Sequence, residues 1–371
     1  MFSKNIFRPN GLIMLSIFSG YGRFISLPPR RMKSLLEITE RGLHCSTGGF
    51  FVDPWGPVDC AVITHAHSDH ARWGSKNYLT AEPGREILRR RLGPNAIIET
   101  LGYGQVTTRN GVKVSLHPAG HILGSSQVRV EYKGEVWVVS GDYKTEDDGM
   151  IAPYEPIRCN TFITESTFGL PIYKWRPQAE IYADINEWWR SNQAQDRTSV
   201  VFGYSLGKAQ RVLAGLDCNI GPIYVHGAVA AFLPAYEAAG VRFPNVELVL
   251  EAKIRSEKGQ PLIIAPPSAD NTPWLRKFGD VSTAFVSGWM QVRGTRRRRA
   301  LDRGFVLSDH ADWDGLIASI RATEAERILV THGYSDILAR WLRENGWQAE
   351  AVQTKFASEV EEDAEVLPPA E

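Results

Sequence analysis

The sequence His65-Ala66-His67-Ser68-Asp69-His70 (residues 65–70) decides the fold class. It follows a short apolar run at 61–63 that is typical of a buried strand. Side chains two residues apart in an extended segment point to the same side, so His65 and His67 face one way. Asp69 follows where it suits the start of a helix, with His70 beside it. These four ligands cannot all reach one tetrahedral ion, so the motif predicts two metal ions close together.

The same pattern recurs along the chain, because several apolar runs end and a residue of ligand type follows within a few positions. Polar residues just past strand ends are where α/β folds place their chemistry. The side chains found in this way are His121, Asp142, Glu165, His310 and His332.

We expect these side chains to complete two metal sites. His121 is predicted to join the first two histidines of the motif on one ion. His332 is predicted to join Asp69 and His70 on the second ion, and Asp142 to bridge both. Imidazole and carboxylate ligands favour Zn²⁺, with Mn²⁺ as the alternative. Two such ions activate water and polarise a phosphoryl oxygen, so the predicted reaction is metal-dependent phosphodiester hydrolysis.

Three further residues receive predicted roles in this chemistry. The leaving oxygen needs a proton, and His310 is the predicted acid, acting together with the ligand Asp69. Glu165 is predicted to orient His310 or a ligand. Asp53, just upstream of the histidine motif, is predicted to support the loop that carries it. For Glu165 and Asp53, a capping or surface role stays open.

Between residues 171 and 303 the sequence pattern changes to an alternation of expected strands and helices. Strands are expected at 198–203, 223–225 and 262–265, and helices at 206–216 and 228–239. This alternation predicts a second α/β domain with its own small parallel sheet, inserted into the first domain. The first domain then comprises 32–170 and 304–356, with its last strands at 304–307 and 327–330.

The two ends of the chain are expected to lie outside these domains. Residues 1–31 are basic with a short apolar stretch, and either form a targeting segment or precede a true start at Met32, which we favour. The acidic segment 357–371 is expected to be disordered. No stretch approaches transmembrane length, which argues against a membrane location. Four cysteines without CxxC spacing are expected to be reduced thiols.

The order of the motifs resembles that of the β-CASP nucleases of the metallo-β-lactamase superfamily over about residues 35–356. Glu165, His310 and His332 stand where that family has its motifs A, B and C. The resemblance implies an α/β fold, the metallo-β-lactamase αββα sandwich with an inserted β-CASP α/β domain.

Four segments are similar to the bacterial ligase-associated DNA exonucleases. They are ERGLHC (40–45), DPWGPVDCAVITHAHSDHAR (53–72), SGWMQVRG (287–294) and RGFVLSDHADW (303–313). This similarity implies a DNA exonuclease in DNA repair, functionally associated with a DNA ligase and a helicase, in a bacterial cytoplasm. In RNA-processing members of the family motif C is a histidine, as it is here, so an RNA nuclease is the alternative. A small-molecule metallohydrolase is less favoured, because a small substrate needs neither the insert nor an arginine block.

Substrate contacts are expected in the inserted domain, with single-stranded DNA or a free DNA end as the substrate. Ser205, Lys208 and Arg211 lie at a strand-to-helix turn that suits a phosphate, with a solvated helix face as the alternative. His226 follows a strand and is a further candidate. An arginine block can neutralise several phosphates, although the net charge of the whole chain is zero. A plain surface charge run is the alternative for this block, whose candidate contacts are Arg293, Arg296 and Arg297.

Overall fold

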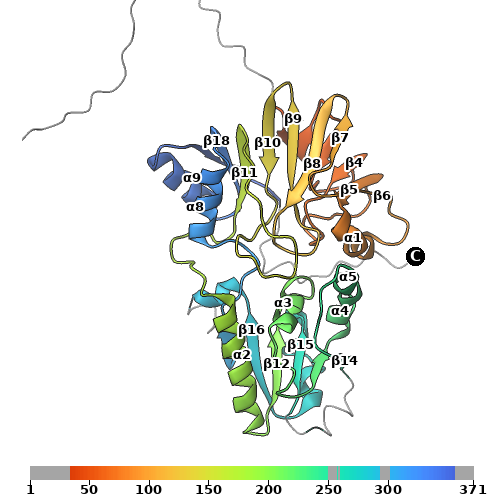
Figure 1. Ribbon diagram of the computed structural model, residues 1–371, viewed down its shortest axis with the longest axis vertical. Coiled ribbons are helices and arrows are strands. Elements are labelled where there is room, and N and C mark those ends of the chain that lie inside the picture. The colour runs from red at the N-terminus through yellow and green to blue at the C-terminus, as the bar shows by residue number, and fades with distance from the viewer. Residues whose placement is uncertain (1–33, 250–256, 258–259, 293–300, 356–371) are drawn as a thin grey trace, which may run out of the picture. The chain divides into compact units, whose positions relative to one another are not determined.

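The computed structural model describes residues 34–249, 257, 260–292 and 301–355 (Figure 1). The described residues from Leu35 onward belong to one compact unit. The predicted extension at 1–31, the acidic segment at 357–371 and the candidate contacts Arg293, Arg296 and Arg297 lie outside the described residues.

Two sheets share one apolar core. The first sheet contains, in spatial order, β1 (Glu37–Thr39), β2 (Gly42–Cys45), β3 (Phe50–Val52), β4 (Cys60–Val62), β5 (Asn77–Ala81) and β6 (Ile98–Leu101). The second contains β19 (Gln348–Ala351), β18 (Arg327–Gly333), β11 (Thr161–Ser166), β10 (Glu135–Val139), β9 (Ser126–Tyr132), β8 (Val112–Pro118) and β7 (Val106–Arg109). Alternate side chains of both sheets, such as Val62, Leu79, Val114 and Val130, are buried together in a single cluster. The two sheets therefore pack face to face.

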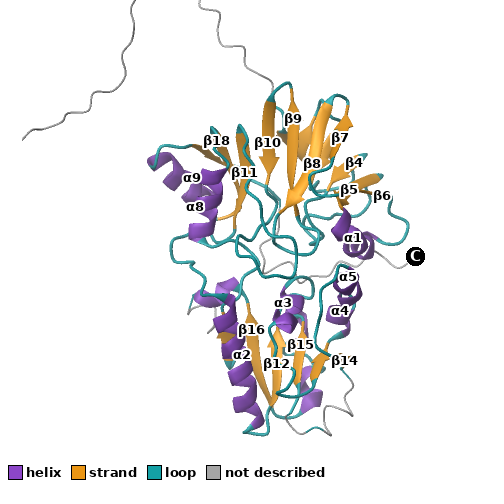
Figure 2. Ribbon diagram, viewed as in Figure 1, coloured by secondary structure: helices purple, strands orange, loops and turns teal. Residues whose placement is uncertain are grey.

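Helices cover the outer faces of these sheets (Figure 2). Helix α1 (Arg85–Leu92) buries Ile87 and Leu88 against residues of β4 and β5 that point away from the shared core. Helices α8 (Trp313–Ala322) and α9 (Ser335–Glu344) pack in the same way against β10, β11 and β18. The arrangement of helix, sheet, sheet and helix confirms the predicted αββα sandwich.

A third sheet is built from the middle of the chain. Its order is β14 (Val246–Leu248), β13 (Ile223–Val225), β15 (Leu262–Ala265), β12 (Thr198–Phe202), β16 (Val281–Val286) and β17 (Arg303–Phe305). Every pairing in it is parallel, as predicted. Helices α2 (Gln178–Gln193) and α3 (Lys208–Ala214) bury apolar side chains against it. Short 3₁₀ turns are η1 (Glu82–Gly84), η2 (Pro267–Ala269), η3 (Leu275–Phe278) and η4 (Gly288–Gln291).

Two sequence expectations about this region are wrong. The strand expected at 304–307 was assigned to the first domain, but β17 pairs with β16 and extends the third sheet. The helix expected at 228–239 is two short helices, α4 (Gly227–Ala230) and α5 (Leu233–Ala238). Pro234 lacks the backbone N–H that would continue the helix across this point, which explains the break.

All four cysteines are free thiols. Within the part of the chain that the structure describes, no helix is both long enough and apolar enough to cross a membrane.

Candidate metal centre

The predicted ligands lie at or near the carboxyl ends of strands from both sheets of the sandwich. His65 and His67 follow β4, His121 follows β8 and Asp142 follows β10, while His332 lies near the end of β18. The register between β11 and β18 shifts between Thr164 and Ser166, opposite this last histidine. Irregularities of this kind reorient single side chains beside active sites. The strand ends thus gather residues that are far apart in the sequence.

Three histidine nitrogens and one carboxylate oxygen meet in a first cluster. Nδ1 of His67 lies 3.2 Å from Nε2 of His65 and 3.1 Å from Nε2 of His121. Oδ2 of Asp142 is 3.5 Å from the same atom of His65. All four side chains are buried, and their ligand atoms lie within 4.8 Å of one another. Spacings of this size are those expected between ligands of one ion.

The opposite ring nitrogens of two of these histidines show which nitrogen carries the proton. Nε2 of His67 lies 3.3 Å from the carbonyl oxygen of Leu206, and Nδ1 of His121 lies 2.8 Å from that of Asp309. A carbonyl oxygen only accepts, so both of these nitrogens donate. The nitrogens that face the cluster then present lone pairs, the arrangement that protein partners impose on metal-binding imidazoles.

A second cluster contains Asp69, His70 and His332 and adjoins the first. Asp142 Oδ2 lies 3.5 Å from Nε2 of His70, the same distance as from the first cluster. Both carboxylate oxygens of Asp69 are buried, and neither accepts a hydrogen bond from the residues that the structure describes. A buried carboxylate in this state is costly unless a cation meets it. The donor set of both clusters therefore fits divalent metal ions.

Asp53 holds the second cluster in place. Its Oδ2 accepts a hydrogen bond of 2.8 Å from Nδ1 of His70, and its Oδ1 accepts one of 2.8 Å from the backbone N–H of Thr64. The Thr64 hydroxyl donates to the same carboxylate and lies 3.0 Å from Nδ1 of His65. Asp53 and His332 both have a φ in the left-handed region, 43° and 51°. Such strain concentrates at functional sites.

Burial sets the charge of the first cluster. It lowers the pKa of His65 and His121, and it lowers the pKa of His67 to about 4. These imidazoles are therefore neutral near pH 7, the form that binds metal. Burial also opposes protonation of His70, but the carboxylates of Asp69 and Asp142 outweigh it and raise the pKa of this histidine to about 10.

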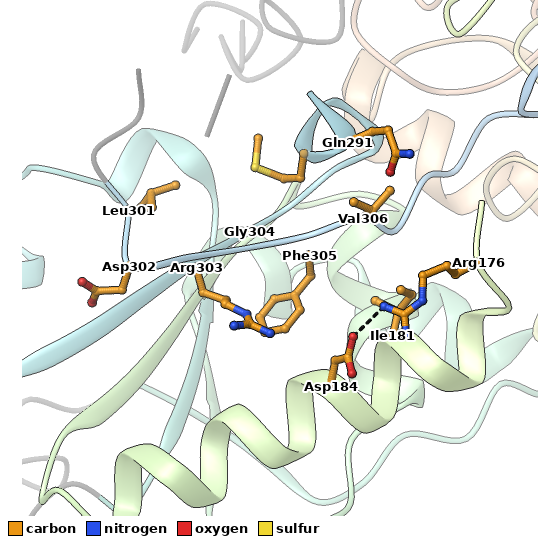
Figure 3. A pocket seen from close by; sticks show the side chains of 11 residues that line it. Arg176, Ile181, Asp184, Gln291, Leu301, Asp302, Arg303, Gly304, Phe305 and Val306 are labelled. Carbon is orange, nitrogen blue, oxygen red and sulfur yellow. Dashed lines mark hydrogen bonds and ion pairs between the residues drawn. The ribbon is translucent and has the colours of Figure 1, made fainter. Parts of the chain in front are cut away.

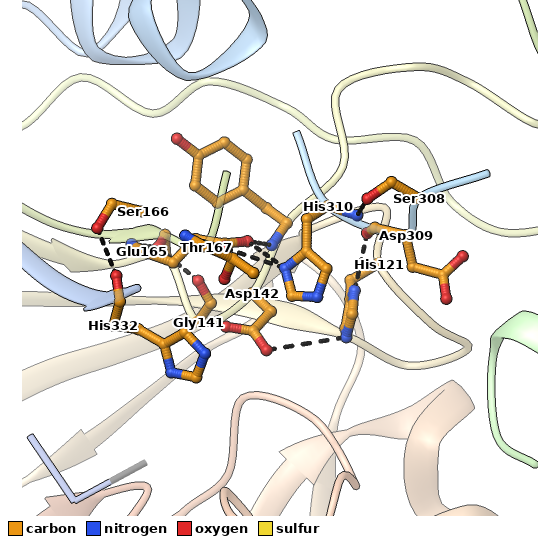
Figure 4. Close-up of polar contacts among 12 residues, drawn as sticks. His121, Gly141, Asp142, Glu165, Ser166, Thr167, Ser308, Asp309, His310 and His332 are labelled. Carbon is orange, nitrogen blue, oxygen red and sulfur yellow. Dashed lines mark hydrogen bonds and ion pairs between the residues drawn. The ribbon is translucent and has the colours of Figure 1, made fainter. Parts of the chain in front are cut away.

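Glu165 and His310 form a buried pair beside the clusters (Figure 4). Nδ1 of His310 lies 2.9 and 3.0 Å from the two carboxylate oxygens of Glu165. The backbone N–H groups of Tyr143 and Thr167 donate to these oxygens and fix the carboxylate. His310 also packs against His121, with ring centroids 4.7 Å apart. Glu165 is thus placed to orient His310, one of the two roles that the sequence left open.

The structure contradicts direct phosphate contact by the two cations of α3, Lys208 and Arg211. The Lys208 side chain is fully buried, and its ammonium nitrogen lies 2.8 Å from Oδ2 of Asp309. Arg211 is 4% exposed and forms ion pairs with Asp309 and Asp148. The predicted strand-to-helix turn exists, but its cations point into the protein because buried carboxylates attract them. Ser205 is also buried.

The structure gives His226 a local role. Its Nδ1 accepts a hydrogen bond of 3.1 Å from the backbone N–H of Ala228, which caps α4, and its ring packs edge-on against Trp274. A contact with substrate stays a prediction.

Sequence reasoning missed three groups that hold the ligands. Thr64 directly precedes the histidine motif, and Asp309 directly precedes His310, so both were adjacent to recognised signals. The third group, the backbone carbonyl of Leu206, carries no side-chain signal at all. Only the fold brings it to a ligand 139 positions away in the sequence.

A cavity of about 450 Å³ lies on the inserted domain (Figure 3). Residues 301–306 form one wall, and the ion pair between Arg176 and Asp184 lies on another. None of the candidate metal ligands lines this cavity. The chemistry is therefore expected at the histidine clusters and not here.

Comparison with known proteins shows the family of this chain. No model of a known protein family matches it. It is 32% identical over 316 residues to a "Probable DNA ligase" of Opitutus terrae, which covers 84% of this chain and 30% of that protein. It is 32% identical to the endoribonuclease ysh1 of Aspergillus fumigatus over 50% of this chain and 26% of that one. It is 23% identical to the transcription termination factor FttA of Lokiarchaeum over 70% of this chain and 47% of that one.

A crystal structure of a protein of unknown function from Enterococcus faecalis has the same fold. The TM-score is 0.53 at 13% identity, with 80% of each chain covered. The αββα sandwich, the third sheet and the two ligand clusters define a metal-dependent hydrolase of the metallo-β-lactamase type. The chain belongs to the β-CASP nucleases of that superfamily. It spans less than half the length of each of the curated relatives named above.

Proposed function

We propose that this protein hydrolyses phosphodiester bonds of nucleic acid with two divalent metal ions. One observation carries the proposal: Oδ2 of Asp142 lies 3.5 Å from a nitrogen of His65 in the first cluster and 3.5 Å from a nitrogen of His70 in the second. A carboxylate shared in this way is placed to contact both ions of a two-metal site.

The residues divide into two metal sites. His65, His67 and His121 would hold one ion and Asp69, His70 and His332 the other, with Asp142 shared. The histidine-rich donor set favours Zn²⁺, with Mn²⁺ as the alternative. When bound, the two ions supply Lewis-acid polarisation of the phosphoryl group and activation of water.

His310 supplies the proton that the leaving oxygen needs. Glu165 holds Nδ1 of this histidine, so the other ring nitrogen is the one that exchanges a proton with substrate.

We propose DNA as the substrate, degraded from an end, within DNA repair alongside a DNA ligase and a helicase in a bacterial cytoplasm. The similarity to a probable DNA ligase over 84% of the chain supports this substrate. Aromatic side chains near His310 also suit an unpaired strand. Trp175 donates to the backbone carbonyl of that histidine, and Trp289 packs near Tyr334; all three rings are half-buried. Aromatic side chains stack bases without sequence preference.

RNA is the second candidate substrate. Endoribonucleases are among the relatives, which supports this candidate. The same metal site serves either polymer.

The deciding experiment incubates metal-loaded protein with matched single-stranded DNA and RNA, each labelled at either end. The Asp142→Ala variant is the control for a contaminating nuclease. Release of mononucleotides from DNA, absent in the control, is the expected result and gives the polarity from the labels. Internal cuts in RNA with DNA left intact would assign the protein to RNA processing.

A further inference from the structure

The backbone of the turn between β12 and α3 contacts the first ligand cluster. The carbonyl of Leu206 accepts the hydrogen bond from His67. Gly207, with a φ of 88°, lies so near Ile122 that a Cβ on it would come within 2.4 Å of that side chain. Ile122 directly follows His121 in the sequence. The turn thus lies against His67 and against the residue that follows His121.

The first residue of α3, Lys208, anchors Asp309. Lys208 is fully buried and pairs with Oδ2 of Asp309 at 2.8 Å, while Arg211 pairs with Oδ1 at 3.2 Å. Arg211 also donates to the carbonyl of Ser308. The Asp309 carboxylate is therefore held from two sides by cations of α3. Its own backbone carbonyl accepts the hydrogen bond from Nδ1 of His121 at 2.8 Å.

We propose that Lys208 is a positioning residue that sets metal affinity at the site of His65, His67 and His121. The inserted domain thereby controls occupancy of one of the two metal sites. The inference rests on the proposed two-metal function. Lys208 acts through Asp309, whose carbonyl fixes the ring of His121 and the nitrogen that carries its proton. Loss of a group that hydrogen-bonds directly to a metal-binding histidine changes metal affinity by about 10–100-fold, so this range is the largest change expected when Lys208 no longer holds Asp309.

The second site does not share this dependence. His70 is oriented by Asp53, which follows β3, and His332 lies on β18. Both of these strands belong to the sandwich and not to the third sheet. A change at Lys208 is therefore expected to act on one site only.

The test measures metal binding directly. Metal-free protein is titrated with Zn²⁺ in competition with a chromophoric chelator, and wild type is expected to bind two ions. Lys208→Met removes the charge at nearly constant length and is expected to weaken one site, by at most about 10–100-fold, leaving the other unchanged. Lys208→Arg is expected to restore most of the affinity. Lys174→Met is the matched control, because Lys174 forms an exposed ion pair with Asp314 at 2.8 Å.

A double variant identifies which site has weakened. His121→Ala removes a ligand of the first site, so adding Lys208→Met to it is expected to cause little further loss. Further loss at the remaining site would overturn the proposal. Unchanged affinities in Lys208→Met, or an equal fall at both sites, would overturn it as well. Should Lys208→Met fail to fold by circular dichroism, Asp309→Asn carries the same prediction and decides the question. Wild type that binds fewer than two ions would instead refute the two-metal function.

Discussion

Two buried polar clusters lie next to each other in this protein and differ in how their charges are met. In the metal centre, both oxygens of Asp69 are buried without a hydrogen bond from the described residues. In the cluster around Asp309, the carboxylate has Lys208 on one side and Arg211 on the other. Arg211 in turn reaches Asp148, which pairs with Lys144 at 2.8 Å.

The difference separates a site that needs a ligand from a site that is complete. Buried charges are tolerated when they are paired or when they coordinate metal. The cations of the Asp309 cluster are paired with carboxylates, so it has no need of a substrate phosphate. In the metal centre, His70 is protonated but the three imidazoles of the first cluster are neutral, so the carboxylates of Asp69 and Asp142 have less positive charge near them and an ion completes the site. Variants in the two clusters should therefore fail in different ways.

The largest effect is expected from Asp142→Ala. This change removes the carboxylate oxygen that lies near both ligand clusters of the metal centre, so neither metal ion is held well. Metal ions contribute several kcal/mol to transition-state stabilisation, which corresponds to a loss of activity of at least about 10³-fold. Hydrolysis rate and bound metal per chain are the measurements. Asp314→Ala, at an exposed position, is the control and should retain both; an active Asp142→Ala would remove the basis of the shared-carboxylate assignment.

His310→Ala should lower the rate and leave the metals in place. A positioned proton donor contributes about 10²–10⁴-fold to the rate, and this histidine pairs with Glu165 in the structure. The measurements are kcat and metal content on the same preparation. Loss of one metal together with activity would mean that His310 is a ligand, a role its proximity to Asp142 and Glu165 also permits.

In the Asp309 cluster, Lys208→Met should act on stability. The change leaves the buried Asp309 carboxylate with Arg211 as its remaining cation, and a buried ion pair that loses one partner costs at most about 3–5 kcal/mol of the free energy of unfolding. Urea unfolding of metal-free protein measures this loss. Lys174→Met should have no measurable effect, because exposed pairs contribute little. Equal stability of the two variants would show that the Asp309 cluster is not the self-sufficient network described here.

The contrast between the metal centre and the Asp309 cluster also explains which parts of the site could be predicted from the sequence. His65, His67 and His121 were predictable because metal ligation needs particular side chains at strand ends, and apolar runs locate those ends. The parallel third sheet followed from the same alternation of strands and helices. These predictions rest on local patterns, which the fold preserves.

The burial of Lys208 and Arg211 was not predictable in this way. A cation at the start of a helix suits a phosphate or a carboxylate equally, and only the fold decides which one it meets. Asp309 approaches Lys208 from 101 positions further along the chain, and β17 joins the third sheet by pairing with β16. Long-range pairing between charges or strand edges leaves no periodic trace in the sequence.

The smallest effect, and the one that best separates the two metal sites, is expected from Asp53→Asn. The amide keeps an acceptor for the backbone N–H of Thr64 but can place an N–H opposite Nδ1 of His70. That histidine would then carry its proton on Nε2, the nitrogen that faces the metal centre, and bind metal poorly. Affinity at the site of Asp69 and His332 should fall about 10–100-fold. The chelator competition used for Lys208→Met measures both sites. A fall mainly at the other site would mean that Asp53 acts through Thr64 and His65, and the two sites would then lack separate supports.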